Sequence, residues 1–234
     1  ESKLKPYIKK GLRFSYAPNW ADDLDIDIAP IVLSKTQKVH FTFAGNIGKV
    51  QNLENIINAF CLLPNEYQKK AQLNIIGDGS NLVNLKKLSN NNPRIVFHGK
   101  QVREDMAKFY KASDFLIVSL IDESIFSVTV PAKIQSYIAA KKPILAIING
   151  DTADIVKDNH LGLHVDPSNI SLISKVFEKC IDINSLYSIY FELKFCLNYN
   201  HNKNLEKLMS FFHKKLSENV LNNIRKSEEL IKFI

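Results

Sequence analysis

Short apolar runs alternate with segments of helical periodicity along this chain, and this alternation restricts the possible folds more than any other feature. The apolar runs lie at residues 40–45, 72–79, 94–99, 114–120, 143–148 and 161–165. Between the first two runs, apolar side chains recur at the spacing of one helix face, at Leu53, Ile56, Ile57, Phe60 and Leu63. Strands that are apolar on both faces and joined by helices form a parallel sheet covered on both sides. The sequence therefore predicts an α/β fold with a doubly wound parallel sheet of about six strands.

The same pattern divides the chain into three segments. Residues 1–38 precede the first strand and are predicted to be a linker and first segment, and residues 39–170 form the sheet domain. Residues 171–234 are predicted to be extra C-terminal helices, with amphipathic stretches at 171–181 and 204–224. These helices are expected to pack on the sheet domain or on an N-terminal domain missing from this chain. The chain does not begin with Met, so we expect it to be a piece of a longer protein.

Composition and charge narrow the class of protein. Of the 234 residues, 45% are hydrophobic and 24% are charged, and no apolar run reaches the roughly 18 residues of a membrane span. The net charge of +7 fits a phosphorylated ligand or an anionic membrane surface. The basic residues form short pairs rather than a stripe with interleaved aromatics, so no nucleic-acid partner is predicted. The three cysteines are widely spaced, which predicts no metal site and indicates a cytoplasmic protein with reduced thiols.

Loops with ligand-binding chemistry follow several of the predicted strands. In doubly wound sheets, ligands bind beyond the carboxyl ends of the strands. Gly45-Asn46-Ile47-Gly48-Lys49 follows the first strand, Gly77-Asp78-Gly79 the second and His98-Gly99-Lys100 the third. Glycine lets the backbone approach a phosphate and Lys49 adds positive charge, so the first loop is a candidate anion site. A tight turn between a strand and a helix is the alternative interpretation of the same residues.

A second candidate anion site is the helix predicted to begin at Thr129-Val130-Pro131. Free N–H groups and the helix dipole at such an end favour a phosphate by about 0.3–1 kcal/mol, and Lys133 lies one turn further on. A plain helix started by proline explains these residues equally well. His98 either faces a ligand or packs as a structural histidine.

Taken in order, the motifs resemble a known family. They include "FTFAGNIGKVQNLENIINAF", "LNIIGDGS", "IVFHGKQ", "FYKASDFLIVSL", "PAKIQSYIAAKKPILA" and "GLHVDP", within residues 15–170. Their order resembles the C-terminal, donor-binding half of a GT-B glycosyltransferase of family 4. The sequence is most similar to the bacterial, fucosaminyltransferase-like branch, which builds surface polysaccharides such as capsule and lipopolysaccharide.

The resemblance implies a Rossmann-like fold and a hexosyltransferase type of enzyme. The donor is then a nucleotide diphosphate sugar, often linked to UDP, and its sugar is transferred with retention of configuration and without a metal or other cofactor. The acceptor is then a glycan or a polyprenol-linked sugar, bound by the N-terminal domain that this chain lacks. The location is the cytoplasm, and a peripheral contact with the inner face of the cell membrane is a further expectation.

By the resemblance, two parts of the chain bind the donor, and the first of them faces its sugar diphosphate. Gly45, Asn46 and Gly48 form the loop that faces it, and Lys49 is the cation nearest to that loop. Lys133 matches the lysine of the branch's Pro-Ser-Lys signature, which here is Pro-Ala-Lys.

Three further groups of residues have donor-binding roles by the resemblance. Gly77 and Gly79 shape the loop after the second strand. The base is held, largely through backbone groups, by Phe97, His98 and Gly99. Backbone N–H groups are offered to the phosphates by Val128, Thr129 and Val130.

The chain departs from the family's pattern at its charged positions. The family's Arg and Lys on the diphosphate correspond to Asn46 and Gln51. Two family glutamates eight residues apart correspond to Val128, at the donor sugar, and Ser136, at the ribose. A serine hydroxyl makes a weaker clamp on the ribose than a charged carboxylate does.

These departures leave alternatives open. Glu123 lies upstream of the missing glutamates as their candidate substitute, and together with Lys49 it is predicted to be catalytic. The family has a glycine just before the Lys142-Pro143 pair, and this chain has Lys141 at that position. The leading hypothesis is a glycosyltransferase donor domain. The alternatives are a non-catalytic interaction domain of the same fold and a nucleotide-sugar epimerase with a base such as His98.

Overall fold

The structure is a computed structural model that describes residues 28–34, 36 and 38–183. The described residues form a six-stranded parallel sheet with helices on both faces. The predicted α/β, Rossmann-like fold is therefore confirmed. The predicted linker up to residue 27 and the amphipathic stretch at 204–224 lie outside the described residues.

The sheet has the strand order β3-β2-β1-β4-β5-β6, and every neighbouring pair is parallel. The strands are β1 (Val39–Ala44), β2 (Ala71–Ile76), β3 (Ile95–Gly99), β4 (Phe115–Ser119), β5 (Ile144–Ile147) and β6 (Gly162–Val165). Each overlaps one of the predicted apolar runs. Strands β1, β2, β4 and β5 are buried along their whole length. The sequences of β4 and β5 are almost continuously apolar, as expected for strands covered on both faces, whereas β1 and β2 also bury His40, Thr42, Gln72 and Asn74.

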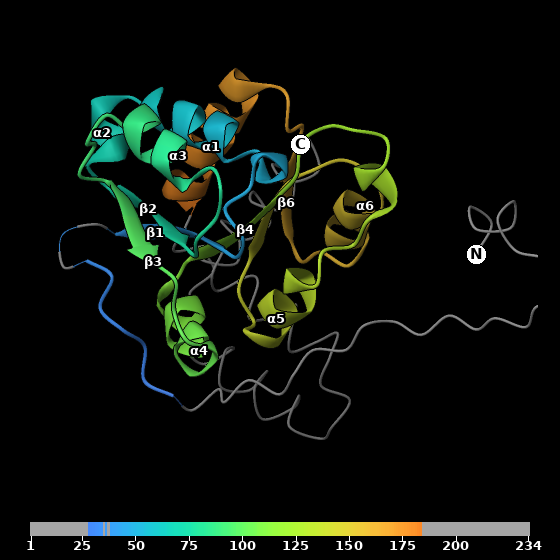
Figure 1. Ribbon diagram of the computed structural model, residues 1–234, viewed down its shortest axis with the longest axis horizontal. Coiled ribbons are helices and arrows are strands. Elements are labelled where there is room, and N and C mark those ends of the chain that lie inside the picture. Colours follow the sequence, from blue (N-terminus) through green and yellow to red (C-terminus); the bar gives the residue numbers. More distant parts are fainter. Residues whose placement is uncertain (1–27, 35, 37, 184–234) are drawn as a thin grey trace, which may run out of the picture.

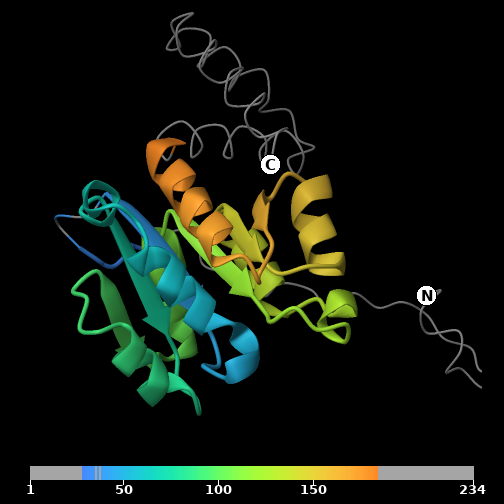
Figure 2. The same cartoon turned by 90° about the horizontal axis from the view of Figure 1, so that it is seen from above.

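Helices cover both faces of the sheet. They are α1 (Leu53–Cys61), α2 (Asn65–Gln68), α3 (Leu82–Leu88), α4 (Arg103–Ala112), α5 (Lys133–Ala139), α6 (Asp151–Asp158) and a helix over residues 170–183, with 3-10 turns η2 (Lys49–Gln51) and η3 (Phe126–Val128). Figure 1 shows α1, α3 and the helix over 170–183 (orange) on one side of the sheet, and α4 and α5 on the other. In Figure 2, α1 and the orange helix cross the strands side by side.

Two apolar cores, one on each face, hold the sheet in place. In the first core, the rings of Phe41 and Phe115 stack 5.3 Å apart, and Phe177 meets Phe41 edge-on at 4.7 Å. Because Phe177 belongs to the helix over 170–183, this part of the predicted C-terminal helices packs on the sheet domain. The second core lies under α4, α5 and α6 and contains the fully buried ring of Tyr137. Burying an aromatic ring of this size stabilises the fold by about 1.5–3 kcal/mol.

The sheet opens at its middle, between β1 and β4. Strand β1 pairs with β2 as far as Ala44, but its pairing with β4 ends at Phe43 and Ile117. The Tyr137 hydroxyl bridges the opening, because it accepts a hydrogen bond from the Ala44 N–H and donates to the Ile117 carbonyl, both at 3.3 Å. The chain extends the sheet through β2 and β3 on one side of this point and through β4 to β6 on the other. Doubly wound sheets place their ligands at such a switch point.

Candidate functional site

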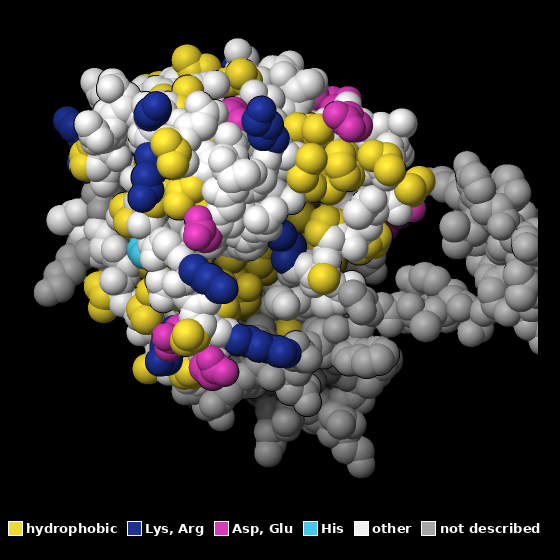
Figure 3. All heavy atoms as spheres, viewed as in Figure 1, with side chains coloured by type: hydrophobic (Ala, Val, Ile, Leu, Met, Phe, Trp, Pro, Cys, Tyr) yellow, Lys and Arg dark blue, Asp and Glu magenta, His cyan; other side chains and the backbone are white. Residues whose placement is uncertain are grey.

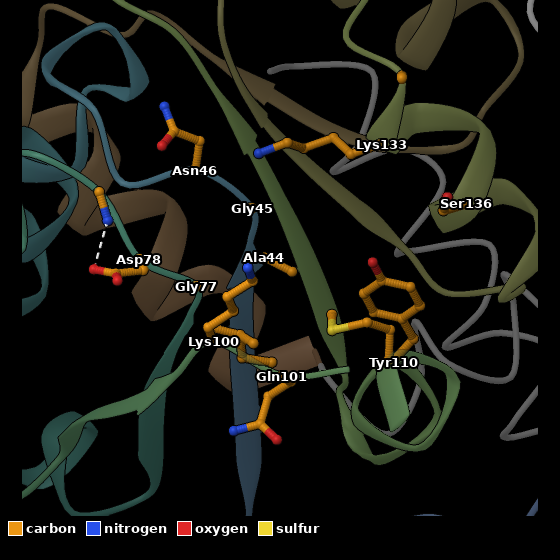
Figure 4. Close-up of a pocket in the computed structure, with 14 residues that line it drawn as sticks. Ala44, Gly45, Asn46, Gly77, Asp78, Lys100, Gln101, Tyr110, Lys133 and Ser136 are labelled. Atoms are coloured by element: carbon orange, nitrogen blue, oxygen red, sulfur yellow. Dashed lines mark hydrogen bonds between the residues drawn. The ribbon is translucent and has the colours of Figure 1, made fainter. Parts of the chain in front are cut away.

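A cavity of about 770 Å³ lies beyond the carboxyl ends of β1 and β2, beside the opening between β1 and β4. One wall comes from the loops after β1, β2 and β3, and the other from α4 and α5 (Figure 4). Its lining residues are Ala44, Gly45, Asn46, Ile76, Gly77, Asp78, Gly79, Lys100, Gln101, Met106, Tyr110, Ala132, Lys133 and Ser136. The volume lies within the range of roughly 300–1,000 Å³ that is usual for small-molecule and cofactor sites.

The first wall is held together by backbone contacts between neighbouring loops. The Gly45 N–H donates to the Ile76 carbonyl at 3.0 Å, and the Ile47 N–H donates to the Asp78 carbonyl at 2.8 Å. The pairing of β1 with β2 therefore continues into the loops. Gly77 has a φ of +133°, and a Cβ there would lie 1.9 Å from the Gly45 carbonyl oxygen. Only glycine fits at this position, because the two backbones are in contact.

Lys133 supplies a buried amine to the cavity. It opens helix α5, and Figure 4 shows its side chain reaching toward the loop after β1. The Nζ atom lies 3.8 Å from the centre of the Phe43 ring, and a Cβ on Gly45 would lie 3.1 Å from it. This Nζ atom is buried and has no hydrogen-bond partner. Burial lowers the pKa of Lys133 to about 7. An amine in this position can bind an anion that enters the cavity.

The sequence interpretation named the loop that carries Lys100 but missed Gln101, Met106 and Tyr110 at the other end of the cavity. Met106 and Tyr110 belong to α4 and line the cavity. Lys100 and Gln101 follow β3, and Figure 4 shows them with Tyr110 at this end. Burial raises the pKa of Tyr110 to about 12, so its phenol stays protonated at neutral pH and can donate a hydrogen bond. Met106 and Tyr110 are four residues apart and therefore share a helix face. That spacing does not reveal whether the face meets a core or a cavity.

The structure brings some of the predicted donor-binding residues together and leaves others apart. Those that line the cavity are Gly45, Asn46, Gly77, Gly79, Lys133 and Ser136. Those that lie outside its lining are Gly48, Lys49, Phe97, His98, Gly99, Glu123, Val128, Thr129 and Val130.

Lys49 was expected to be the cation nearest the glycine loop, but it does not line the cavity, whereas Lys133 does. Lys49 is exposed in the turn η2, whereas the Lys133 amine reaches Gly45. The turn is tied to the end of β4, because the Ser119 hydroxyl donates to the Gln51 carbonyl at 2.5 Å. Lys49 is close to the loop only along the chain, while Lys133 approaches it through the fold. A catalytic role for Lys49 stays a prediction.

The helix predicted to begin near Pro131 begins later. Helix α5 starts at Lys133 and is seven residues long. The Ile134 N–H donates to the Pro131 carbonyl at 3.0 Å, and the Gln135 N–H donates to the Ala132 carbonyl at 3.3 Å. These two N–H groups are therefore bonded within the chain, and an anion site at the start of α5 stays a prediction.

The backbone before this helix also differs from the prediction. The N–H of Thr129 donates to the Phe126 carbonyl at 3.0 Å within the turn η3, so it is not offered to a phosphate. Val128 and Val130 stand on either side of it and are 48% and 38% exposed. The prediction for Thr129 is wrong, because the sequence does not show the 3-10 turn that uses its N–H.

His98 has a structural role in this fold. Its Nε2 atom lies 2.9 Å from Asn74 Oδ1, and its ring packs edge-on against Phe109 at 5.2 Å. Burial lowers the pKa of His98. Its carbonyl accepts a hydrogen bond from the Gln101 side chain at 2.7 Å. The Phe97 side chain packs against the first core. Neither side chain lines the cavity, and a base contact through the backbone of this strand stays a prediction.

The loop that carries Glu123 is fixed against α6. The Asn149 side chain donates to Asp122 Oδ1 at 3.1 Å, and the Thr152 hydroxyl donates to the Thr129 carbonyl at 2.8 Å. Glu123 itself is exposed, and it does not contribute to the cavity lining. Its substitution for the missing glutamates therefore stays a prediction.

The charges of the cavity suit an anionic ligand. Figure 3 shows basic side chains around the hollow on this face, with apolar side chains inside it. Lys100 and Lys133 line the cavity together with one carboxylate, Asp78, whose Oδ1 atom accepts the Gly79 N–H at 2.8 Å. Within residues 28–34, 36 and 38–183, no three His, Cys, Asp or Glu side chains gather into a metal-binding group.

A doubly wound sheet with a cavity at its switch point is an architecture that many nucleotide-binding proteins use. The chain matches the family "Glycosyl transferases group 1" over residues 26–190 and belongs to that family. The probable glycosyltransferase WbjE of Pseudomonas aeruginosa is 28% identical over 232 residues, which are 93% of this chain and 56% of that protein. The chain therefore spans little more than half the length of this relative.

Solved glycosyltransferases share the fold. WaaG, a glycosyltransferase involved in lipopolysaccharide biosynthesis, matches with a TM-score of 0.60 and 16% identity, over 76% of this chain and 47% of that one. The pneumococcal O-GlcNAc transferase GtfA, in complex with UDP and GlcNAc, matches with a TM-score of 0.58 and 12% identity, over 98% of this chain and 42% of that one. Among the residues that the structure describes, no helix has both the length and the apolarity to cross a membrane.

Proposed function

We propose that this chain is the donor-binding half of a glycosyltransferase and that its cavity binds a nucleotide diphosphate sugar. The observation that carries the proposal is the Lys133 amine, which faces Gly45 inside the cavity at the switch point without a protein partner. The diphosphate lies beside Lys133, Gly45 and Asn46, where a positive charge and an open backbone meet. A UDP-linked donor is the first choice, because GtfA, which has the same fold, was solved with UDP.

The nucleoside extends along the second wall in this proposal. Tyr110 and Met106 of this wall offer an aromatic and apolar surface to the base, and Gln101 of the first wall offers a polar group. Ser136 lies one turn after Lys133 and contacts the ribose through its hydroxyl. This placement uses the full length of the cavity, from Asn46 at one end to Tyr110 toward the other (Figure 4).

The reaction proposed is a retaining transfer of the sugar, without a metal, to a glycan or polyprenol-linked acceptor held by an N-terminal domain. A protonated Lys133 beside the diphosphate stabilises the charge that develops on the leaving nucleotide. The proposed setting is bacterial surface polysaccharide synthesis at the inner face of the membrane, and the shared fold of WaaG, a glycosyltransferase involved in lipopolysaccharide biosynthesis, supports the polysaccharide part. Membership of a glycosyltransferase family favours this reaction over the epimerase alternative.

A non-catalytic interaction domain is the second candidate. Val128 and Ser136 stand where the resemblance expects glutamates, and neither can supply a carboxylate. This candidate predicts a folded chain with an empty cavity.

Isothermal titration of the chain with UDP, GDP, CDP and ADP, each with and without Mg²⁺, tests the proposal. We expect one nucleotide to bind with an affinity that Mg²⁺ does not change. Lys133→Met should weaken it at least tenfold, because a hydrogen bond to a charged group contributes about 1.5–3 kcal/mol. Lys49→Met is the matched control and should change the affinity less than about threefold.

A folded chain that binds none of the four nucleotides would favour the non-catalytic domain. Equal losses in Lys49→Met and Lys133→Met would contradict the assignment of the diphosphate to Lys133.

A further inference from the structure

Lys133 stands out among the charged residues of the cavity because its amine is buried before any ligand arrives. Its Nζ atom rests 3.8 Å from the centre of the Phe43 ring and accepts or donates no hydrogen bond. An aromatic face attracts an ammonium by about 0.5–2 kcal/mol. That attraction is smaller than the several kcal/mol that removal of an ammonium from water costs.

The charged and titratable groups that face Lys133 do not compensate for this burial. The loop after β2 supplies one carboxylate, Asp78, which already accepts the Gly79 N–H at 2.8 Å. The loop after β3 supplies Lys100, a second cation. Helix α4 supplies Tyr110 and helix α5 supplies Tyr137, and burial raises the pKa of both phenols, so they stay neutral. The loop after β1 supplies only uncharged groups to the cavity.

Position 136 explains why the amine lacks a partner. Ser136 follows Lys133 by three residues within α5, which is a spacing at which helix side chains pair. A glutamate at this position would be placed to form an ion pair with Lys133 and keep its amine charged. With serine there, the negative charge has to come from a ligand.

We propose that Lys133 is a proton-coupled anchor, which rests as a neutral amine in the empty cavity and takes up a proton from the solvent when the diphosphate of a sugar nucleotide binds beside it. The lone pair of Nζ forms the new N–H bond, and the water or buffer acid that gives the proton is left with the electron pair. The inference rests on the proposed donor site and adds that the site responds to pH.

The direction of the pH response follows from linkage. Burial lowers the pKa of the empty-state amine to about 7, and the bound diphosphate raises it again. Below about pH 7 the amine is already charged, so affinity is high and nearly constant. Above this pH each binding event takes up one proton from the solvent, and affinity falls about tenfold per pH unit until the pKa of the bound-state amine is reached.

A lysine ¹³C NMR titration of the 234-residue chain between pH 6 and 10 measures the amine directly, and Lys133→Arg identifies its resonance. We expect a midpoint near 7 in the empty chain. Saturation with whichever of UDP-glucose, GDP-mannose or ADP-glucose binds should raise it by about two units. Sugar nucleotides are used because the free terminal phosphate of a nucleoside diphosphate itself titrates near pH 6.

Ser136→Glu is the matched variant, and its empty-state midpoint should return toward the ordinary value of 10.5. An ordinary midpoint in the empty wild-type chain, or a low midpoint that stays unchanged when a sugar nucleotide binds, would overturn the inference alone. A low midpoint in a folded chain that binds none of the three would overturn the donor site and the coupling together.

Discussion

The two walls of the cavity depend on different interactions. The wall formed by the loops after β1 and β2 is held by contacts between backbone atoms. Gly77 lies so close to the Gly45 carbonyl that a Cβ on Gly77 has no room. The wall formed by α4 and α5 consists of side chains, with Lys133 over the Phe43 ring and Tyr110 facing the cavity. The first wall fixes the shape of the site and the second sets its chemistry. Substitutions in the first should therefore affect stability, and substitutions in the second should affect binding.

Gly77→Ala is the strongest test of the first wall. The new Cβ would lie 1.9 Å from the Gly45 carbonyl oxygen, at a φ of +133°. Backbone strain and overpacking should together lower the free energy of unfolding by about 3–4 kcal/mol, measured by urea denaturation. Gly99→Ala is the control, because its φ is +68° but no atom lies within 4 Å of the new Cβ. It should lose only about 1 kcal/mol. Equal losses would show that contact between the loops does not hold this wall.

Lys133→Met tests the second wall in the empty chain. The folded-state pKa of about 7 lies below the ordinary 10.5, so the unfolded chain binds more protons and wild-type stability rises between these two pH values. Lys133→Met should therefore be more stable than wild type by on the order of 3 kcal/mol at pH 6, with the gap closing toward pH 10. Urea denaturation of both proteins at pH 6, 8 and 10 measures this difference in the free energy of unfolding.

Lys49→Met is the control for this pH dependence. Lys49 is exposed in η2, so its replacement should change the free energy of unfolding by less than about 0.5 kcal/mol at every pH. If the difference in free energy of unfolding between Lys133→Met and wild type were the same at all three pH values, the Lys133 amine would not be buried and unpaired in the folded chain. A gain in stability together with a loss of nucleotide binding would show that this wall gives up stability for function.

The same division explains how much the sequence could predict. Continuous apolar runs marked β4 and β5, and glycines after β1 and β2 marked the loops that meet at the cavity. The sequence could not show that Gly77 faces another loop while Gly45 faces Lys133, because a glycine looks the same in both settings. Nor could it place Lys133 beside a loop that is distant along the chain. The contacts between side chains that are far apart in the sequence could be identified only from the folded structure.

Pro131 illustrates a local signal that placed a helix start to within two residues, since its carbonyl accepts the Ile134 N–H in the first turn of α5. Proline favours the first turn of a helix, which is why a helix was predicted to begin near it. In the structure the preceding loop is held to α6 by the hydrogen bond from Thr152 to the Thr129 carbonyl. The chain therefore forms the turn η3 first, and α5 starts at Lys133.

Tyr137→Phe tests the support under the second wall. The variant keeps the ring and removes the hydroxyl that bridges Ala44 and Ile117, which leaves the Ala44 N–H without this partner. A buried N–H without a hydrogen bond costs about 1–3 kcal/mol, so we expect a loss near 1.5 kcal/mol by urea denaturation. Tyr110→Phe is the matched control, since its ring packs against Tyr137 while Figure 4 shows its hydroxyl toward the cavity. It should lose less than about 0.5 kcal/mol.

Lys141→Gly should give the smallest change, and it is a gain. Lys141 follows the end of α5 with a φ of +54°. Glycine is the usual residue in this left-handed conformation after a helix. Because a non-glycine residue is strained there, the substitution should raise the free energy of unfolding by about 0.5–1 kcal/mol. Lys142→Gly removes the neighbouring lysine where φ is not positive, and it should lower stability, because glycine loses more entropy on folding. If both variants lost stability equally, the backbone at Lys141 would not be strained. A substitution at the end of α5 would then only lower stability, as substitutions in the first wall do.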